Sequence, residues 1–175
     1  MQIRPARHDD FDALAAITNH YIATTAIHFA YEPVSVDELR ATWKPRFPWF
    51  VAEDQGVVGY AKAGVWRERA AYQWTCEVGI YVAEAARGRG VGKRLFGELL
   101  DECALRGFRS AVSGITLPND TSVALHQKLG FTHVGTFLDA GWKLGAWHAV
   151  DWWQKRFTTG AQGPALTASM SVAPR

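Results

Sequence analysis

The chain has 175 residues, of which 48% are hydrophobic and 13% aromatic, enough for one domain with a full core. Its 19 basic and 17 acidic residues leave a net charge of +2, which does not indicate a nucleic-acid-binding surface. The two cysteines form no Cys-x-x-Cys motif and the histidines form no His-x-x-x-His pair. With no signal peptide and no long apolar segment, we expect a cytoplasmic protein without membrane contact or a metal site.

Hydrophobic periodicity in the first half of the chain predicts two helices and four strands. Apolar residues recur at helical spacing within 8–24, and Ser35 with Glu38 has the pattern of a capping box for a second helix at 35–43. The remaining apolar runs are typical of strands: 1–7, two strands within 48–66 around a turn at 54–56, and 70–83.

The second half of the chain continues the alternation of helices and strands. We expect a helix at 92–107, a strand at 108–117, a helix at 119–130 and an antiparallel pair within 131–157. Residues 158–175 are rich in Ala, Ser, Thr, Pro and Gly and lack any period, so we expect a flexible tail. The pattern predicts one α/β or α+β domain over 1–157.

A glycine-rich basic stretch, "EAARGRGVGKRL" at 84–95, follows the apolar run "VGIYV". It is not a P-loop, because Arg87 stands at the first required glycine and Arg94 at the required Ser or Thr. It is not a dinucleotide fingerprint, because its glycines run as G-x-G-x-G. Small residues before a helix still allow backbone amides to approach an anion, so we expect a phosphate site of another kind.

The order of elements and this loop resemble the GCN5-related N-acetyltransferase superfamily. The superfamily's pyrophosphate loop, Q/R-x-x-G-x-G/A, matches Arg87 to Gly92 at every fixed position. The later Asn and the helix ending in "KLGF" also fit the superfamily. The stretches "NHYI", "PWFVAE", "AYQWTCE", "LPNDTSVALHQKLGF" and "GWKLGAWHAVDWWQ" are similar to the phosphinothricin and methionine sulfone acetyltransferase family. The resemblance covers 1–157.

This resemblance implies a mixed sheet of about seven strands with four helices, and acetyl transfer from acetyl-CoA to the amine of a small amino acid or analogue. It also implies a homodimer. The residues expected to bind acetyl-CoA are Ile80, Tyr81, Val82, Arg87, Gly88, Arg89, Gly90, Val91, Gly92, Lys93, Asn119 and Ser122. Asn119 can cap its helix and still offer polar atoms to a pantetheine arm.

Acetyl transfer to an amine needs a proton acceptor, an oxyanion donor and a proton source for the thiolate. Glu77 lies in an otherwise uncharged run and is our candidate base; the alternative is a structural carboxylate paired with an Arg. A backbone N–H of Tyr81 or Val82 would bind the oxyanion. His126 stands where many superfamily members have a tyrosine thought to protonate the thiolate; the alternative is a partly buried structural histidine.

Arg69 and Tyr72 lie between two expected strands, beside the expected acceptor site. An Arg there can bind an α-carboxylate in bidentate fashion, which would select free amino acids; the alternative, ordinary surface arginines on a solvated loop, applies above all to Arg67. The resemblance also implies that the loop after the first helix walls the pocket, with candidates Asn19, His20, Phe29 and Tyr31.

Two other functions use the same cofactor loop. A CoA-binding module without turnover would need neither Glu77 nor His126, and both are present. A protein N-terminal acetyltransferase would need an open acidic groove, whereas this chain offers Arg and aromatic residues. Nucleic-acid binding comes last, because four basic residues on one turn are too few for a backbone-tracking surface.

Overall fold

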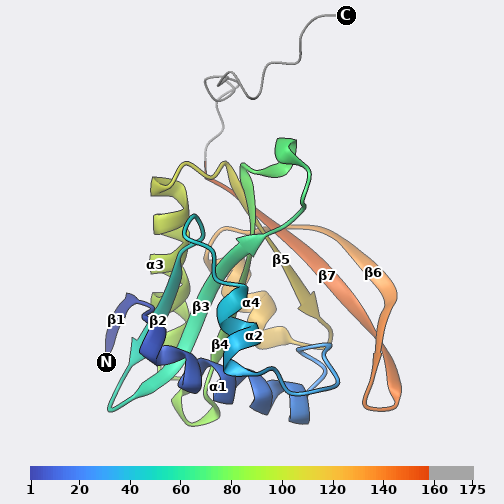
Figure 1. Ribbon diagram of the computed structural model, residues 1–175. Helices are drawn as coiled ribbons and strands as arrows, with labels where there is room; N and C mark the ends of the chain where they lie inside the picture. Colours follow the sequence, from blue (N-terminus) through green and yellow to red (C-terminus); the bar gives the residue numbers. More distant parts are fainter. Residues whose placement is uncertain (158–175) are drawn as a thin grey trace, which may run out of the picture.

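Seven strands form one mixed sheet in the computed structural model, which describes residues 1–157 (Figure 1). In spatial order the sheet runs β1-β2-β3-β4-β5-β7-β6, and only the β4–β5 pair is parallel. The strands are β1 Gln2–Pro5, β2 Trp49–Glu53, β3 Val57–Val65, β4 Thr75–Val82, β5 Ser110–Thr116, β6 Thr132–Lys143 and β7 Ala146–Arg156. The helices are α1 Phe11–Thr24, α2 Val36–Ala41, α3 Val91–Leu105 and α4 Asp120–Lys128. The predicted fold class is confirmed; the predicted tail lies outside the described residues.

The helices cover both faces of the sheet, and each face has its own apolar core. The core on the α1 and α2 face contains Phe11, Leu14, Leu39, Trp49, Val51 and Tyr60. The larger core on the α3 and α4 face includes Val78, Leu95, Phe96, Leu99, Phe108 and Phe131. Because side chains alternate along a strand, β4 contributes Cys76 and Val78 to the second core and Tyr81 to the first.

Two element boundaries differ from the prediction by three residues or more. The helix expected from residue 8 begins as a 3₁₀ turn, His8–Asp10, before α1. The strand expected from residue 70 begins at Thr75, because Ala70–Tyr72 form a 3₁₀ turn in which Tyr72 N donates to Arg69 O at 2.9 Å. The capping box of α2 is confirmed, since Ser35 Oγ accepts from Glu38 N and Glu38 Oε2 accepts from Ser35 N.

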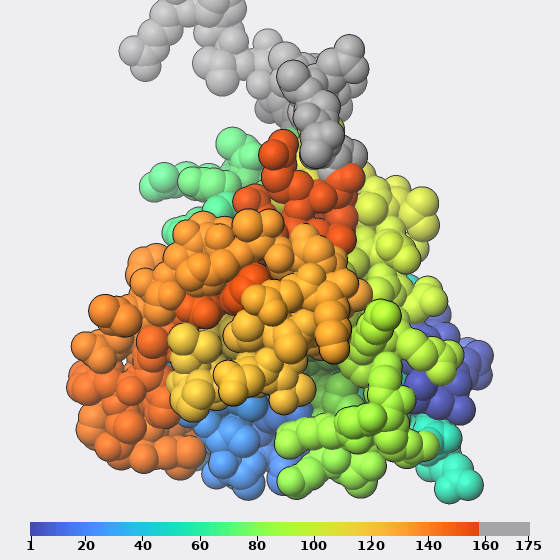
Figure 2. All heavy atoms as spheres, turned by 180° about the vertical axis from the view of Figure 1, so that it is seen from behind, coloured from blue at the N-terminus to red at the C-terminus, as the bar shows by residue number. Residues whose placement is uncertain are grey.

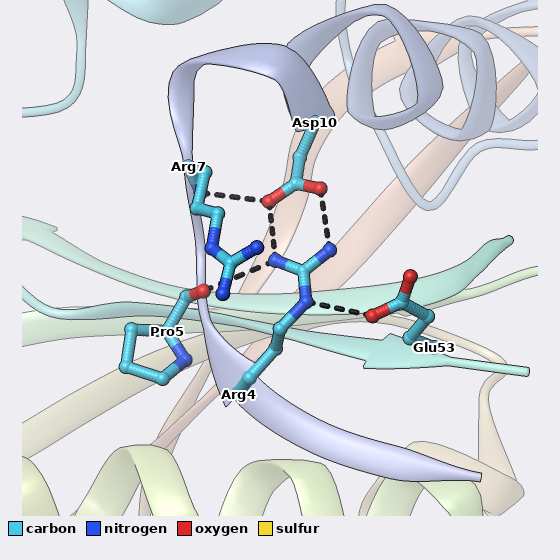
Figure 3. Close-up of polar contacts among 5 residues, drawn as sticks. All are labelled: Arg4, Pro5, Arg7, Asp10 and Glu53. Carbon is cyan, nitrogen blue, oxygen red and sulfur yellow. Dashed lines mark hydrogen bonds and ion pairs between the residues drawn. The ribbon is translucent and has the colours of Figure 1, made fainter.

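A cluster of charged residues fixes the start of α1 against the sheet edge (Figure 3). Arg4 on β1 donates two hydrogen bonds of 2.8 Å to the carboxylate of Asp10 and one of 2.7 Å to Glu53 on β2. Asp10 also accepts from Arg7 N at 2.7 Å. The hydrogen bonds from Arg4 hold the pKa of Asp10 below its usual range. This bidentate pair therefore ties the N-cap of α1 to β1.

The parallel strands β4 and β5 separate after a short contact. They pair only at Thr75, Cys76 and Glu77, opposite Ser110, Ala111 and Val112. Beyond these pairs β4 continues to Val82 and β5 to Thr116. The two strands therefore diverge and leave a V-shaped opening in the middle of the sheet.

Candidate active site

The opening between β4 and β5 continues into a cavity of about 590 Å³ bounded by α3 and α4. A volume of this size is typical of small-molecule and cofactor sites. The strands contribute residues 79–82 and 113–116 to the walls. In the view from behind, the green residues that lead into α3 and the yellow to orange residues of α4 stand on either side of a hollow (Figure 2).

The glycine loop forms the end of this cavity at the N-terminus of α3. Gly88 and Gly90 have φ angles of +74° and +75°, which L side chains rarely adopt, and Gly90 is the N-cap of α3. No atom lies within 4 Å of a Cβ added at either glycine, so the backbone is open to a ligand. The Arg87 guanidinium lies 5.2 Å from the ring centre of Tyr21. Free amides, a helix N-terminus and adjacent cations make this end suitable for phosphate.

Of the twelve residues predicted to bind the cofactor, all but one line the cavity. The exception is Arg89, whose Nη2 lies 2.8 Å from Asp54 Oδ2 in the β2–β3 turn. That ion pair turns the side chain toward the sheet edge, so Arg89 is not among the cavity residues. Asn119 caps α4 as predicted, because its Oδ1 accepts from Ser122 N at 3.2 Å.

Glu77 lies on the face of the sheet covered by α1 and α2, where β4 begins to leave β5. It forms no ion pair with any residue in 1–157, which disfavours the structural alternative of an Arg-paired carboxylate. Burial raises the pKa of Glu77, and the positive charges of Lys62 and Arg67 partly oppose that increase. A carboxylate with a raised pKa and no fixed partner is suited to accept a proton.

His126 is 2% exposed and packs against the rings of Phe96 and Phe131. Its Nδ1 lies 2.8 Å from the backbone carbonyl of Ser122, which can only accept, so Nδ1 carries the proton. Nε2 lies 3.0 Å from Ser113 Oγ and therefore accepts from that hydroxyl. Burial lowers the pKa of His126, so the ring is neutral at pH 7. Ser113 and His126 both line the cavity.

The backbone of β4 decides which amides face the opening. Ala83 N donates to Val58 O on the β3 side at 2.8 Å, and β3 and β4 pair without a register shift. Because amides alternate in direction along a strand, those of Ile80 and Val82 face away from β3 and that of Tyr81 faces toward it. The Tyr21 hydroxyl donates to Val82 O at 2.7 Å and accepts a long hydrogen bond of 3.4 Å from Val82 N, which an oxyanion would replace. Of the two predicted oxyanion donors, this geometry favours Val82.

The residues predicted to bind the substrate fall into two groups. Asn19 and Phe29 hold the loop after α1: the Asn19 side chain hydrogen bonds both backbone groups of Val34, and Phe29 covers Gly141 on β6. Phe29 lies 2.6 Å from a Cβ built at Gly141, so only glycine fits beneath the ring.

The other group lies between β3 and β4. Tyr72 is 38% exposed and packs edge-on against Trp66, with ring centres 5.1 Å apart. Arg69 is exposed and precedes the 3₁₀ turn. Arg67, which the sequence did not favour, is the arginine whose charge acts on Glu77.

Lys62 on β3 was not predicted from the sequence as part of the site. It pairs with Gly79 on β4, while Glu77 pairs with Gly64 on β3, so all four residues share one face of the sheet. A lysine inside the run "GYAKAGV" was the available signal, since a charged residue in a central strand is uncommon.

Comparison with known proteins identifies the family. The chain matches the Acetyltransferase (GNAT) family over residues 14–131. The chain belongs to the GNAT family of acetyltransferases. It is 44% identical over 162 residues to the phosphinothricin N-acetyltransferase of Streptomyces viridochromogenes, covering 90% of this chain and 88% of the relative. It is 36% identical over 152 residues to the L-methionine sulfoximine/L-methionine sulfone acetyltransferase of Salmonella typhimurium, covering 84% and 89%.

A solved GNAT structure confirms the fold. The phosphinothricin acetyltransferase of Sinorhizobium meliloti, solved in complex with acetyl-CoA, superposes with a TM-score of 0.89 at 30% identity, covering 94% of this chain and 92% of the other. In this GNAT acetyltransferase, no helix within 1–157 is long and apolar enough to cross a membrane. The same residues contain no group of three or more His, Cys, Asp or Glu side chains that could hold a metal ion.

Proposed function

We propose that this GNAT acetyltransferase transfers the acetyl group of acetyl-CoA to the α-amine of a free amino acid or amino acid analogue. The observation that carries the proposal is the position of Glu77, a carboxylate of raised pKa without an ion pair, beside two cationic side chains at the opening of the sheet. Relatives named for phosphinothricin and for methionine sulfone support an acceptor of this class.

The residues that line the cavity suit the successive parts of acetyl-CoA. The glycine loop with Arg87 and Lys93 would hold the diphosphate at the N-terminus of α3. Ile80 and Leu125 offer apolar walls, and Asn119 offers an amide to the pantetheine arm. Arg89 would act here by holding Asp54 and the β2–β3 turn, not by direct contact. When bound, acetyl-CoA supplies an acetyl group activated as a thioester.

Glu77 would accept a proton from the acceptor ammonium, directly or through one water. The free amine would then form the new C–N bond at the thioester carbon, and the N–H of Val82 would bind the oxygen that becomes negative. The C–S bond breaks as the carbonyl reforms.

The departing thiolate takes up a proton. The acceptor nitrogen loses a second proton as the amide forms, and this proton balances the one that the thiolate gains. We propose that the Ser113 hydroxyl, which lines the cavity, relays it, and that our candidate His126, whose Nε2 carries no proton in this tautomer, holds that hydroxyl in position.

Two observations weigh against the alternatives. A CoA-binding module without turnover has no use for an unpaired half-buried Glu77. A protein N-terminal acetyltransferase needs room for a peptide, whereas the loop after α1 is fastened to β6 by a hydrogen bond from Tyr31 Oη to Trp142 O.

We also propose a cytoplasmic homodimer. Six large apolar side chains are exposed on the β6–β7 hairpin: Val134, Phe137, Leu138, Trp142, Leu144 and Trp147. β6 is an edge strand of the sheet, and a concentration of apolar side chains on such an edge is typical of a surface that a second copy covers. Sedimentation of Leu138→Asp beside the wild type tests this: a wild-type monomer would contradict it.

The function is tested by measuring thiol release from acetyl-CoA with free amino acids, methionine sulfone, methionine sulfoximine and phosphinothricin, and with a peptide of free N-terminus. We expect turnover with at least one free amino acid or analogue and little with the peptide. Turnover with the peptide alone would contradict the proposal.

A further inference from the structure

Lys62 occupies an unusual position for a lysine, in the central strand β3 with its side chain half-buried. Its ammonium lies 5.3 Å from the ring centre of Trp49. Within residues 1–157 it has no hydrogen-bond acceptor and no ion-pair partner. Burial lowers the pKa of Lys62, so the cation–π contact with Trp49 compensates its charge only in part, which is a reason to expect an anionic ligand.

The floor beside Lys62 is made of glycines. Gly64 and Gly79 lie on the same face of the sheet as Lys62 and Glu77. A Cβ added at Gly64 would meet nothing within 4 Å, and one at Gly79 would meet only Tyr81, at 3.9 Å. Gly79 also lines the large cavity. The space between Lys62 and Glu77 is therefore open and borders the opening where acetyl transfer is proposed.

The charges around this space do not balance. The positive charges of Lys62 and Arg67 lower the pKa of Glu77, and the negative charge of Glu77 raises the pKa of Lys62. With Glu77 ionised the set carries one excess positive charge. A zwitterionic amino acid with a neutral side chain leaves that excess unchanged, whereas one with an anionic side chain cancels it.

We infer that the Lys62 ammonium binds an anionic group on the side chain of the acceptor, so that the preferred substrate is an amino acid with a second acid besides its α-carboxylate. The inference rests on the proposed function and narrows its substrate class. Lys62 is then a specificity-determining residue, and Arg67 remains available for the α-carboxylate.

Phosphinothricin and methionine sulfone form a matched pair of probes. They share the amino acid backbone, the side-chain length and a terminal methyl group, but the phosphinate is negatively charged and the sulfone is neutral. We expect Lys62→Met to lower kcat/KM for phosphinothricin about tenfold to a hundredfold and that for methionine sulfone by no more than about twofold. Lys62→Arg, which keeps the charge, should retain most of the preference.

Lys44→Met serves as the control, because it removes one exposed positive charge outside the site. Acetyl-CoA affinity and the thermal midpoint of each variant show whether the fold is intact. An equal loss with both probes would overturn the inference, since Lys62 would then act through Glu77 or on the fold. A wild type that acetylates neither probe nor any other amino acid would instead overturn the proposed function.

Discussion

The ammonium group of Lys143 on β6 donates a hydrogen bond of 2.6 Å to the backbone carbonyl of Ile22 in α1, 121 positions away in the sequence. A second hydrogen bond, of 2.5 Å, reaches the carbonyl of His28 in the following loop. Lys143 is 4% exposed, and burial lowers its pKa. One side chain thus fastens both ends of the segment that approaches the acceptor site.

We expect Lys143→Met to destabilise the protein by about 1–3 kcal/mol, because one buried and one partly buried carbonyl lose their donor. The KM for the amino acid should rise more than the KM for acetyl-CoA, since the loop lies on the acceptor side. Urea denaturation and steady-state kinetics measure these effects, with Lys44→Met as the control. Unchanged stability would show that the two hydrogen bonds contribute nothing.

Gly90 offers a test of the cofactor loop with an internal control. Gly90 and Gly145 have φ angles of +75° and +77°, and neither has an atom within 4 Å of an added Cβ. Asp at either position therefore carries the same backbone strain, but only Gly90 lies at the cavity. We expect Gly90→Asp to weaken acetyl-CoA binding about tenfold or more by charge repulsion and Gly145→Asp to leave it unchanged. Calorimetry that finds equal affinities would remove the loop assignment.

Glu77→Gln should lower turnover about 10²- to 10⁴-fold with little change in acetyl-CoA affinity. Because burial raises the pKa of Glu77, the acid limb of the wild-type rate profile should lie above the ordinary glutamate value of 4.5. A wild-type rate for the variant across this pH range would place the base elsewhere.

The same shift affects stability. Because the pKa of Glu77 is higher in the folded protein than in the unfolded chain, the folded state binds this proton more tightly. The free energy of unfolding therefore falls as pH rises from 4.5 through the folded pKa. Glu77→Gln should therefore melt at a higher temperature than the wild type above neutral pH. A lower thermal midpoint at that pH would contradict the shift.

Arg67 and Arg69 can be separated by single substitutions. If a guanidinium binds the α-carboxylate, its removal should raise the KM for the amino acid about tenfold to a hundredfold and leave that for acetyl-CoA nearly unchanged. We expect Arg67→Ala to show the larger effect, because Arg67 is the arginine whose charge lowers the pKa of Glu77 and which therefore lies nearer the proposed reaction centre. Amino acid amides should be poor substrates of the wild type. Equal rates for acid and amide would exclude carboxylate recognition.

His126 predicts a pH dependence of stability. Its folded pKa lies below the ordinary value of 6.5, so the unfolded chain binds the proton more readily and stability falls as pH drops below 6.5. We expect His126→Gln to lose this part of the pH dependence, measured as the difference in unfolding free energy from the wild type. Parallel curves for the two proteins would mean that the ring is not neutral in the fold.

The helices, their caps and the glycine loop were predicted correctly, because each depends on residues that are close together in the sequence. The capping box of Ser35 and Glu38 and the cap at Asn119 are each set by residues three positions apart. The loop at Gly88 to Gly92 was found in the same way, from the spacing of its glycines.

Contacts between distant segments could not be predicted from such patterns. Arg89 meets Asp54, 35 positions away, and so leaves the cavity that its motif suggested. Lys62 reaches the acceptor side only through the register of β3 against β4. The pairing of His126 with Ser113 depends on how α4 packs on β5. Register and packing are fixed by the whole sheet, and no single stretch of sequence encodes them.

The short contact between β4 and β5 joins two halves of the sheet, one of β1 to β4 and one of β5, β7 and β6, through only three residue pairs. Glu77 and Lys62 lie on strands of the first half, whereas Ser113 lies on β5 of the second half and His126 on α4, which is hydrogen bonded to it. A ligand bound between β4 and β5 contacts both halves, so its binding should raise the free energy of unfolding by holding them together. A substitution at Thr75, whose Oγ1 lies 3.1 Å from Ser110 Oγ at the other end of this contact from Glu77, would shift one group of catalytic residues against the other, although Thr75 is not one of them.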